Sequence, residues 1–221
     1  MRSLLMALVL GSLMAPALSA NAQHHDADMR NRFGASLLLG GGGDVEYHGE
    51  VVAPIVGVIG GRADDDLDGS YGLGLSYDVP FHDYFTVGAS LELLSWNTDG
   101  RGDNGVDRFT LANLGGFIKV RIPLRSGSTT IEPYARLPLG LSLNFPSNDD
   151  VDDRLNTGFG FNSGLWLGAT FFVSDNIGLN AELGYRYFRV SHEVDLNGSN
   201  PDFDMTVGQG GLNLGVVFTL D

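Results

Sequence analysis

The chain has 221 residues, with 13 lysines and arginines against 27 aspartates and glutamates, 32 glycines and no cysteine. The acidic balance disfavours a nucleic-acid partner, and the lack of cysteine excludes both disulfides and a thiol-linked lipid anchor. The length fits one domain, and no stretch beyond the N-terminus is long and apolar enough for a transmembrane helix, so any membrane crossing must use strands.

The N-terminus has the pattern of a secretory signal peptide. Arg2 precedes an apolar run from Leu4 to Leu13 that is too short to span a bilayer, and Ala20-Asn21-Ala22 supplies the small-x-small pattern of a cleavage site. We therefore expect cleavage after Ala22, with residues 1–22 as the signal peptide and residues 23–221 as a single exported domain.

Eight later segments alternate with a period of two, which is the pattern of β-strands with two different faces. Most run beyond ten residues, longer than strands of soluble proteins and long enough to cross a membrane. In chain order they are Phe33–Gly40, Gly69–Val79, Tyr84–Trp96, Arg108–Leu124, Thr129–Phe145, Gly158–Val173, Asn176–His192 and Asp204–Leu220. The sequence thus predicts an all-β fold, an eight-stranded antiparallel up-and-down transmembrane β-barrel.

The connections between these segments alternate in length. Three are tight turns, at Pro80–Asp83, Arg125–Ser128 and Ser174–Asp175. Four are long and polar, at Gly41–Asp68, Asn97–Asp107, Pro146–Thr157 and Glu193–Phe203. Transmembrane barrels place short turns in the periplasm and long loops outside, and an even strand number returns both termini to the periplasm. This pattern predicts the orientation of the barrel.

Aromatic residues on the apolar phase fall near both ends of the predicted strands, as in the two interfacial girdles of such barrels. Toward the long connections they are Tyr71, Phe145, Phe159, Tyr185 and Tyr187. Toward the tight turns they are Tyr77, Phe85, Phe171 and Phe218.

The signal peptide, the eight alternating segments and the final Leu212–Asp221 resemble the small outer-membrane barrels of the OmpA transmembrane-domain and OmpX type. The resemblance implies the cell outer membrane, reached by export through the periplasm, and a monomer whose partners are outer-membrane lipid, lipopolysaccharide and the barrel assembly machinery. Such barrels usually end in an aromatic residue, whereas this chain ends in Asp221, three places after Phe218. No peptidoglycan-binding domain follows, so cell-wall anchoring does not carry over.

Seven charged residues share the inward phase of the predicted strands. The interior of an eight-stranded barrel is just wide enough for side chains, and buried charges need partners there, so we expect a plug of ion pairs. Antiparallel pairing across the Arg125–Ser128 turn brings Arg121 close to Glu132. The seven residues are Glu92, Lys119, Arg121, Glu132, Arg136, Glu182 and Arg186.

A catalytic candidate is Ser191-His192-Glu193. Neighbours on a strand point to opposite faces, so Ser191 and His192 cannot form a nucleophile–base pair, and we interpret His192 as a surface histidine at a strand end. The clusters Gly40–Gly43 and Gly158–Gly160 lack the following helix of a phosphate loop and instead indicate crowded inward positions. We therefore expect no enzyme and no catalytic residue.

The four long connections, with Asp204 at the edge of the last, hold 18 acids against three arginines. In the first, Asp64, Asp66 and Asp68 precede Gly69 at the spacing of a calcium loop, although Leu75 stands where such a loop has glutamate. We expect no resident cofactor, and either weak binding of Ca²⁺ or Mg²⁺ or simply a solvated charged loop. The apolar Val51–Ile59 stretch could form a hairpin above the membrane, dip into the lumen or contact a partner.

These observations favour a structural and surface-interaction barrel that displays acidic extracellular loops around an ion-paired, closed lumen. The alternative is a narrow passive channel for ions or small apolar molecules. An outer-membrane lipid enzyme is the third interpretation.

Overall fold

The structure is a computed structural model that describes residues 29–49, 61–98, 108–126, 129–147, 156–193 and 202–220. The predicted signal peptide and its cleavage site lie outside the described residues, as does the Val51–Ile59 stretch. Within the described ranges, no helix is long and apolar enough to cross a membrane.

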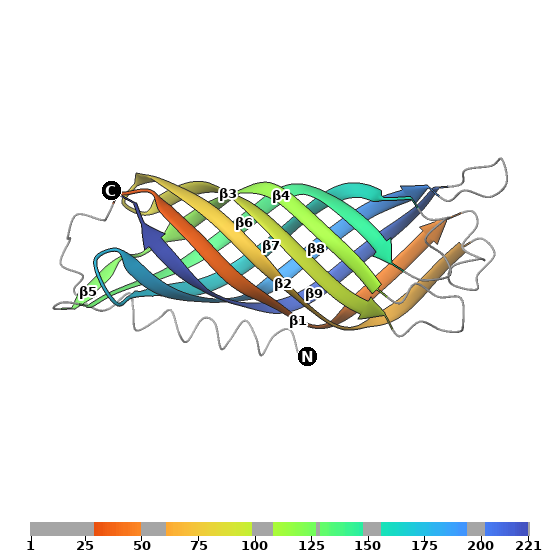
Figure 1. Cartoon of the computed structure of the whole chain (residues 1–221), viewed down its shortest axis with the longest axis horizontal. Helices are drawn as coiled ribbons and strands as arrows, with labels where there is room; N and C mark the ends of the chain where they lie inside the picture. Colours follow the sequence, from red (N-terminus) through yellow and green to blue (C-terminus); the bar gives the residue numbers. More distant parts are fainter. Residues whose placement is uncertain are drawn as a thin grey trace.

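The described chain is built of antiparallel strands that close on themselves (Figure 1). The strands are β1 (Arg32–Gly49), β2 (Gly61–His82), β3 (Phe85–Thr98), β4 (Arg108–Arg121), β5 (Leu124–Ser126), β6 (Thr129–Ser147), β7 (Gly158–Phe172), β8 (Ile177–Glu193) and β9 (Asp202–Thr219). Each long strand pairs on both sides, and β1 closes the ring by pairing with β9. Since β5 has only three residues, the wall is an eight-stranded barrel, and the predicted fold class is confirmed.

The predicted strand Arg108–Leu124 is interrupted in the structure. Pairing between β4 and β6 ends at Arg121 opposite Tyr134, and pairing between β5 and β6 resumes at Leu124 opposite Ile131. Pro123 lies in this interval, where its missing N–H removes a ladder hydrogen bond. The single long strand expected here was therefore wrong.

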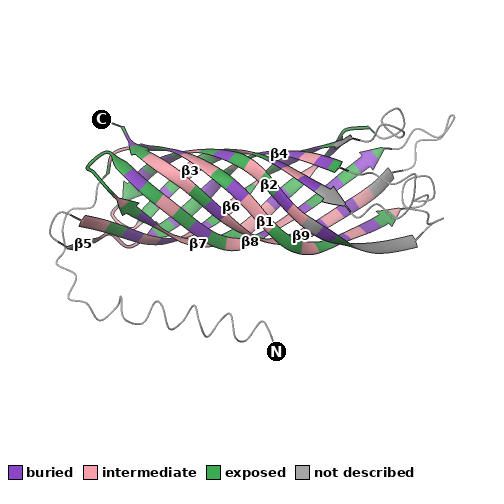
Figure 2. Ribbon diagram, turned by 60° about the horizontal axis from the view of Figure 1, so that its bottom comes forward, coloured by how far each residue is buried: buried purple, intermediate pink, exposed green. Residues whose placement is uncertain are grey.

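Burial alternates along the strands, so that every second side chain faces the interior and the others face outward (Figure 2). Large aliphatic side chains cover the outside, among them Leu73, Leu114 and Leu139, which are 65%, 63% and 67% exposed. An apolar outer band combined with a charged interior is the reverse of a soluble barrel and fits a wall that faces lipid.

The first predicted connection is mostly strand. β1 continues to Gly49 and β2 begins at Gly61, so the expected loop at Gly41–Asp68 was wrong in its bounds. A bulge separates this extension from the part of the barrel nearer the tight turns, because the β1–β9 register shifts between Gly40 and Gly43. On β2, Gly69 has a φ of 130°, which L side chains rarely adopt. Period-two alternation cannot continue through such a bulge, and the extension starts again in a new phase.

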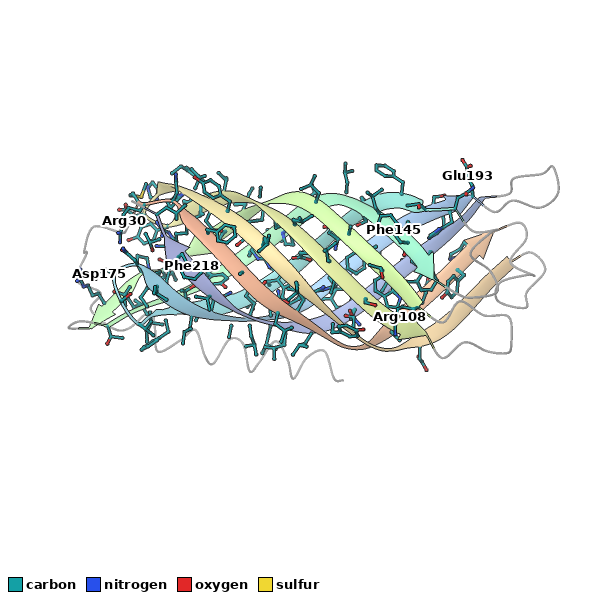
Figure 3. All side chains as sticks on the ribbon, in the orientation of Figure 1. Arg30, Arg108, Phe145, Asp175, Glu193 and Phe218 are labelled. Carbon is teal, nitrogen blue, oxygen red and sulfur yellow. The ribbon has the colours of Figure 1, made fainter. Side chains whose placement is uncertain are left out.

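The aromatic girdles lie on the outer surface, with Tyr71 and Phe159 more than half exposed toward the long connections. Phe218 lies with Arg30 and Asp175 at one end of the barrel, whereas Phe145, Arg108 and Glu193 lie toward the other (Figure 3). Both ends of the described chain are at the turn end, since Leu220 N–H donates to the Asn31 carbonyl at 2.8 Å.

Candidate functional site: the barrel lumen

The lumen end near the tight turns holds one carboxylate between two guanidinium groups. Glu132 on β6 accepts from Arg32 on β1 at 2.6 and 3.2 Å and from Arg121 on β4 at 3.2 Å. All three side chains are buried. Arg32 also lies over the Phe172 ring, 5.0 Å from its centroid. Charge-assisted hydrogen bonds of this kind compensate the desolvation that each ion would otherwise suffer.

A second ion pair joins Lys119 on β4 to Asp78 on β2, across the intervening strand β3. The Lys119 ammonium also faces the rings of Tyr134 at 4.7 Å and Phe117 at 5.5 Å. Aromatic faces stabilise a cation in a site where water is scarce. The pair therefore connects two strands that are separated by one strand of the wall.

The third ion pair is bidentate. Arg136 donates from Nε and Nη2 to the two oxygens of Glu182, at 3.0 and 2.7 Å. The Asn213 side chain donates to Glu182 at 2.8 Å and accepts from Arg186 at 3.2 Å. The Arg186 guanidinium stacks 4.8 Å from the centroid of the Trp166 ring. This network connects β6, β8 and β9 across the interior.

Little space remains between these groups. A cavity of about 30 Å³ lies among Glu92, Asp78, Lys119 and Arg136, which is room for about two water molecules. Within the described residues, Glu92 and Arg186 have no oppositely charged side chain at ion-pair distance. Glu92 is half-buried beside the cavity, where water can solvate its carboxylate.

A layer of neutral polar side chains follows toward the long connections. Ser142 donates to Asn113 at 2.6 Å, and Asn162 donates to Ser142 at 3.0 Å. On the other side of the lumen, Ser70 donates to Gln209 at 2.6 Å, and Gln209 donates to the Gly41 carbonyl at 2.8 Å. These hydrogen bonds connect strands on the side of the ion pairs that faces the long connections, and the one between Ser70 and Gln209 joins β2 to β9 across β1.

The outermost described layer of the lumen is mainly apolar, and its apolar residues form one buried cluster beside the buried Asn144 and His192. The Trp96 ring stacks on Phe188 with centroids 6.2 Å apart and contacts Phe109 at 5.9 Å. The cluster contains Leu38, Val45, Tyr47, Leu67, Leu94, Trp96, Phe109, Leu111, Phe188, Val190, Met205 and Val207, each no more than 4% exposed. Charged, neutral polar and apolar layers thus succeed one another along the barrel axis.

The structure brings together most of the inward charges predicted from sequence. It pairs Arg121 with Glu132 and Arg136 with Glu182, whereas Lys119 pairs with a residue outside that set. Sequence reasoning missed Arg32 and Asp78 because no partner for them is visible along the chain. The inward direction of Asp78 could be predicted, since it continues the small inward residues Ser70, Gly72, Gly74 and Ser76. Arg32 precedes the predicted segment Phe33–Gly40.

The proposed metal ligands lie on β2, where the backbone is an extended strand and not a calcium loop. Alternate residues of a strand are roughly 6.5 Å apart, so Asp64, Asp66 and Asp68 are spread along the strand. The Asp66 side chain is exposed, and those of Asp64 and Asp68 lie outside the described side chains. Among the side chains that are described, no group of three His, Asp or Glu residues could hold a metal ion.

Ser191 and His192 lie on opposite faces of β8, with Ser191 exposed and His192 buried. The His192 ring is only 1% exposed, so its interpretation as a surface histidine was wrong. Its Nδ1 lies 3.0 Å from the Asn156 carbonyl oxygen. The adjacent Gly158 leaves the room that this ring occupies, because a Cβ there would lie 2.5 Å from the imidazole.

The closed ring of eight long antiparallel strands, apolar outside and ion-paired within, defines a small transmembrane β-barrel. A family model described as the outer membrane protein beta-barrel domain matches residues 5–218. The chain belongs to this family, and its location is the outer membrane. No curated protein sequence matches it.

Solved structures share the fold at low sequence identity. The outer membrane protein OprG from Pseudomonas aeruginosa is 14% identical, with 90% of this chain and 99% of that chain covered and a TM-score of 0.63. Neisserial surface protein A (NspA) is 16% identical, with 86% and 97% covered and a TM-score of 0.51. The Escherichia coli outer membrane protease OmpT, at 9% identity with 90% and 99% covered, has a TM-score of 0.39, too low to carry its activity over to this chain.

Proposed function

We propose that this protein is a structural barrel of the outer membrane that presents acidic strand ends and loops at the cell surface, with a lumen closed to ions and solutes. The observation that carries this proposal is the filling of the lumen. Three ion-pair groups leave a cavity of only about 30 Å³, and a buried apolar cluster lies above them. A dissolved ion would have to displace several charge-assisted hydrogen bonds to pass.

The proposal includes no enzymatic step, because Ser191 and His192 lie on opposite faces of the wall. Its partners are outer-membrane lipid and lipopolysaccharide. Weakly bound Ca²⁺ or Mg²⁺ would bridge the carboxylates of Asp64, Asp66 and Asp68 to lipopolysaccharide phosphates. Oxygen ligands from carboxylates and phosphates suit these hard cations.

The second candidate is a narrow passage for small apolar molecules. The apolar layer around Trp96 and Phe188 favours it, because such a lining accepts apolar solutes more readily than ions. The ion-paired layers beneath oppose complete passage through the lumen, since an apolar molecule there would have to break paired charges without replacing their hydrogen bonds.

Planar-bilayer recordings of the purified protein test the proposal. Wild type should show no stable conductance, whereas Arg136→Ala combined with Glu182→Ala should conduct, because it removes the bidentate pair that occupies the lumen beside β7. Leu139→Ala is the matched control, since this residue of the same strand faces outward and should leave the lumen closed. Steady conductance of the wild type would show that the lumen is an open channel.

A further inference from the structure

The hydrogen-bond ladder between β6 and β7 is broken at Pro138, in the middle of the wall. Pairing stops after Arg136 opposite Trp166 and resumes at Leu139 opposite Ser163. The register is the same on both sides of the break, which places Pro138 opposite Gly164. Because proline has no N–H, the ladder hydrogen bond that this position would donate to Gly164 cannot form. The break therefore removes a hydrogen bond without shifting a strand.

The other prolines of β6 lie where a ladder is already interrupted. The Pro133 carbonyl accepts from Ile122 N–H at 2.9 Å, so its nitrogen faces the interval between β4 and β5. Pro146 lies beyond Asn144, the last residue of β6 that pairs with β7. Strand prolines are usually confined to such edges and bulges. Pro138 instead leaves an incomplete ladder at membrane depth, where backbone groups without hydrogen bonds are costly.

An open groove of about 780 Å³ crosses the outer wall at this break. Its floor consists of inward-phase residues, and two rows of outward side chains form its sides. The floor is Gly88, Phe117, Pro138 and Gly164, one side includes Ile118, Leu137, Leu165 and Tyr185, and the other includes Gly116, Leu139, Ser163 and Tyr187. Gly116 and Ser163 widen the groove because their side chains are absent or small.

The groove slopes along the barrel and is polar at one end. Gly88 lies close to Phe85, where β3 leaves a tight turn, whereas Tyr187 lies beyond the middle of β8 toward the long connections. The tyrosine end is therefore nearer the outer surface and the aliphatic end nearer the periplasm. Ser163 and Tyr187 are register partners that place two hydroxyl groups at this end. Tyr185 is half exposed, and its hydroxyl lies over Gly208 on β9, so Tyr185 lines the groove with its ring.

We propose that this groove is a specific lipid site that holds one acyl chain of an outer-leaflet lipid, with the ester or phosphate oxygens of that lipid at the hydroxyls of Tyr187 and Ser163. The groove is continuous with the lipid-facing surface, and its aliphatic sides exclude water from the chain. Tyrosine is suited to the polar end, because its ring prefers the membrane interface while its hydroxyl donates to a lipid oxygen. A seated chain also covers the incomplete ladder at Pro138.

Trp166 provides a probe beneath the groove, since its Nε1 lies 3.3 Å from the position of a Cβ at Gly164. A Trp96→Phe variant leaves Trp166 as the sole tryptophan, because the chain has two. The full-length protein would be placed in bilayers containing increasing fractions of phosphatidylglycerol brominated on one acyl chain. We expect saturable quenching of Trp166 fluorescence at a low fraction of brominated lipid, above the proportional quenching caused by bulk lipid.

Two outward-facing glycines supply a matched pair of variants. A side chain at Gly116 would project into the groove, whereas one at Gly210 would project from β9, and neither position has an atom closer than 3.4 Å to the added Cβ. Gly116→Leu should abolish the saturable quenching, and Gly210→Leu should retain it. Ser163→Leu fills the groove from β7. It replaces Gly116→Leu if that variant does not fold, which is tested by the difference in gel migration between boiled and unboiled samples.

Quenching that stays proportional to brominated lipid in the wild type would overturn the lipid site, as would equal loss in the Gly116→Leu and Gly210→Leu variants. Sedimentation in detergent tests a different occupant. A dimer that dissociates in the Gly116→Leu variant would show that a second copy covers the groove and would also overturn the proposal. The lumen conductance test is independent, because the groove-filling side chains point outward.

Discussion

Replacing Glu132 with alanine should destabilise the barrel more than any single loss of a surface charge. Its carboxylate accepts three hydrogen bonds from Arg32 and Arg121, at 2.6, 3.2 and 3.2 Å. Alanine would leave two buried guanidinium groups facing each other without a counter-ion. The lost attraction to Glu132 and the repulsion between the two guanidinium groups both lower the free energy of unfolding.

Breaking a buried ion pair by removing one partner typically costs about 3–5 kcal/mol. Hydrogen bonds to charged groups contribute about 1.5–3 kcal/mol each, although contributions within one network are not additive. We therefore expect Glu132→Ala to lower the free energy of unfolding by about 4 kcal/mol, or close to a thousandfold in the folding equilibrium. The penalty comes from unpaired buried charge, so removing the charges together should relieve it.

Urea unfolding from lipid vesicles, followed by the difference in gel migration between boiled and unboiled samples, measures this change. A triple variant with Arg32→Met, Arg121→Met and Glu132→Leu should recover to within about 1 kcal/mol of wild type, because apolar replacement of a buried ion group is often neutral or stabilising. Glu193→Ala, an exposed carboxylate at the other end, should change stability by less than about 0.5 kcal/mol. A triple variant as unstable as Glu132→Ala would refute the explanation from unpaired charge.

Further predictions concern the backbone and the surface. Pro138→Ala should be about 1 kcal/mol more stable than Pro146→Ala in the same unfolding assay. Both variants lose the same restriction of the unfolded chain, but only Pro138→Ala restores an N–H opposite a paired residue of β7, since Pro146 lies beyond the last pair. Equal stabilities would contradict the broken-ladder explanation. Gly69→Ala should destabilise by about 1–3 kcal/mol through its φ of 130°, with Gly210→Ala as the unstrained comparison. Calcium titration by calorimetry should show saturable binding with a Kd on the order of 10⁻⁴ to 10⁻³ M. Loss of that binding when Asp64, Asp66 and Asp68 are changed to Asn would support these three residues as the site, and unchanged binding would exclude them.

The strands of the barrel on the turn side of the bulge, and the direction of their side chains, could be predicted from sequence. Alternation with a period of two is a local property of extended backbone, so the phase of Arg136 or Glu182 can be read without knowing any partner. The same property predicts that the side chains of Ser191 and His192 lie on opposite faces of the strand. Strand starts such as Arg108 and Gly158 could also be predicted, because polar and glycine-rich connections interrupt the alternation.

Which inward charges meet, and where the alternation of a strand is interrupted, depends on contacts between strands that are far apart in the sequence. Arg32 reaches Glu132 across 100 positions of sequence because barrel closure and strand stagger bring β1 and β6 to one level of the lumen. The bulge beside Gly69 restarts the alternation in a new phase, so the sequence pattern of the strand extensions is typical of a loop. The consequence of Pro138 depended on which neighbour its nitrogen faces, and strand pairing, not composition, determines that direction.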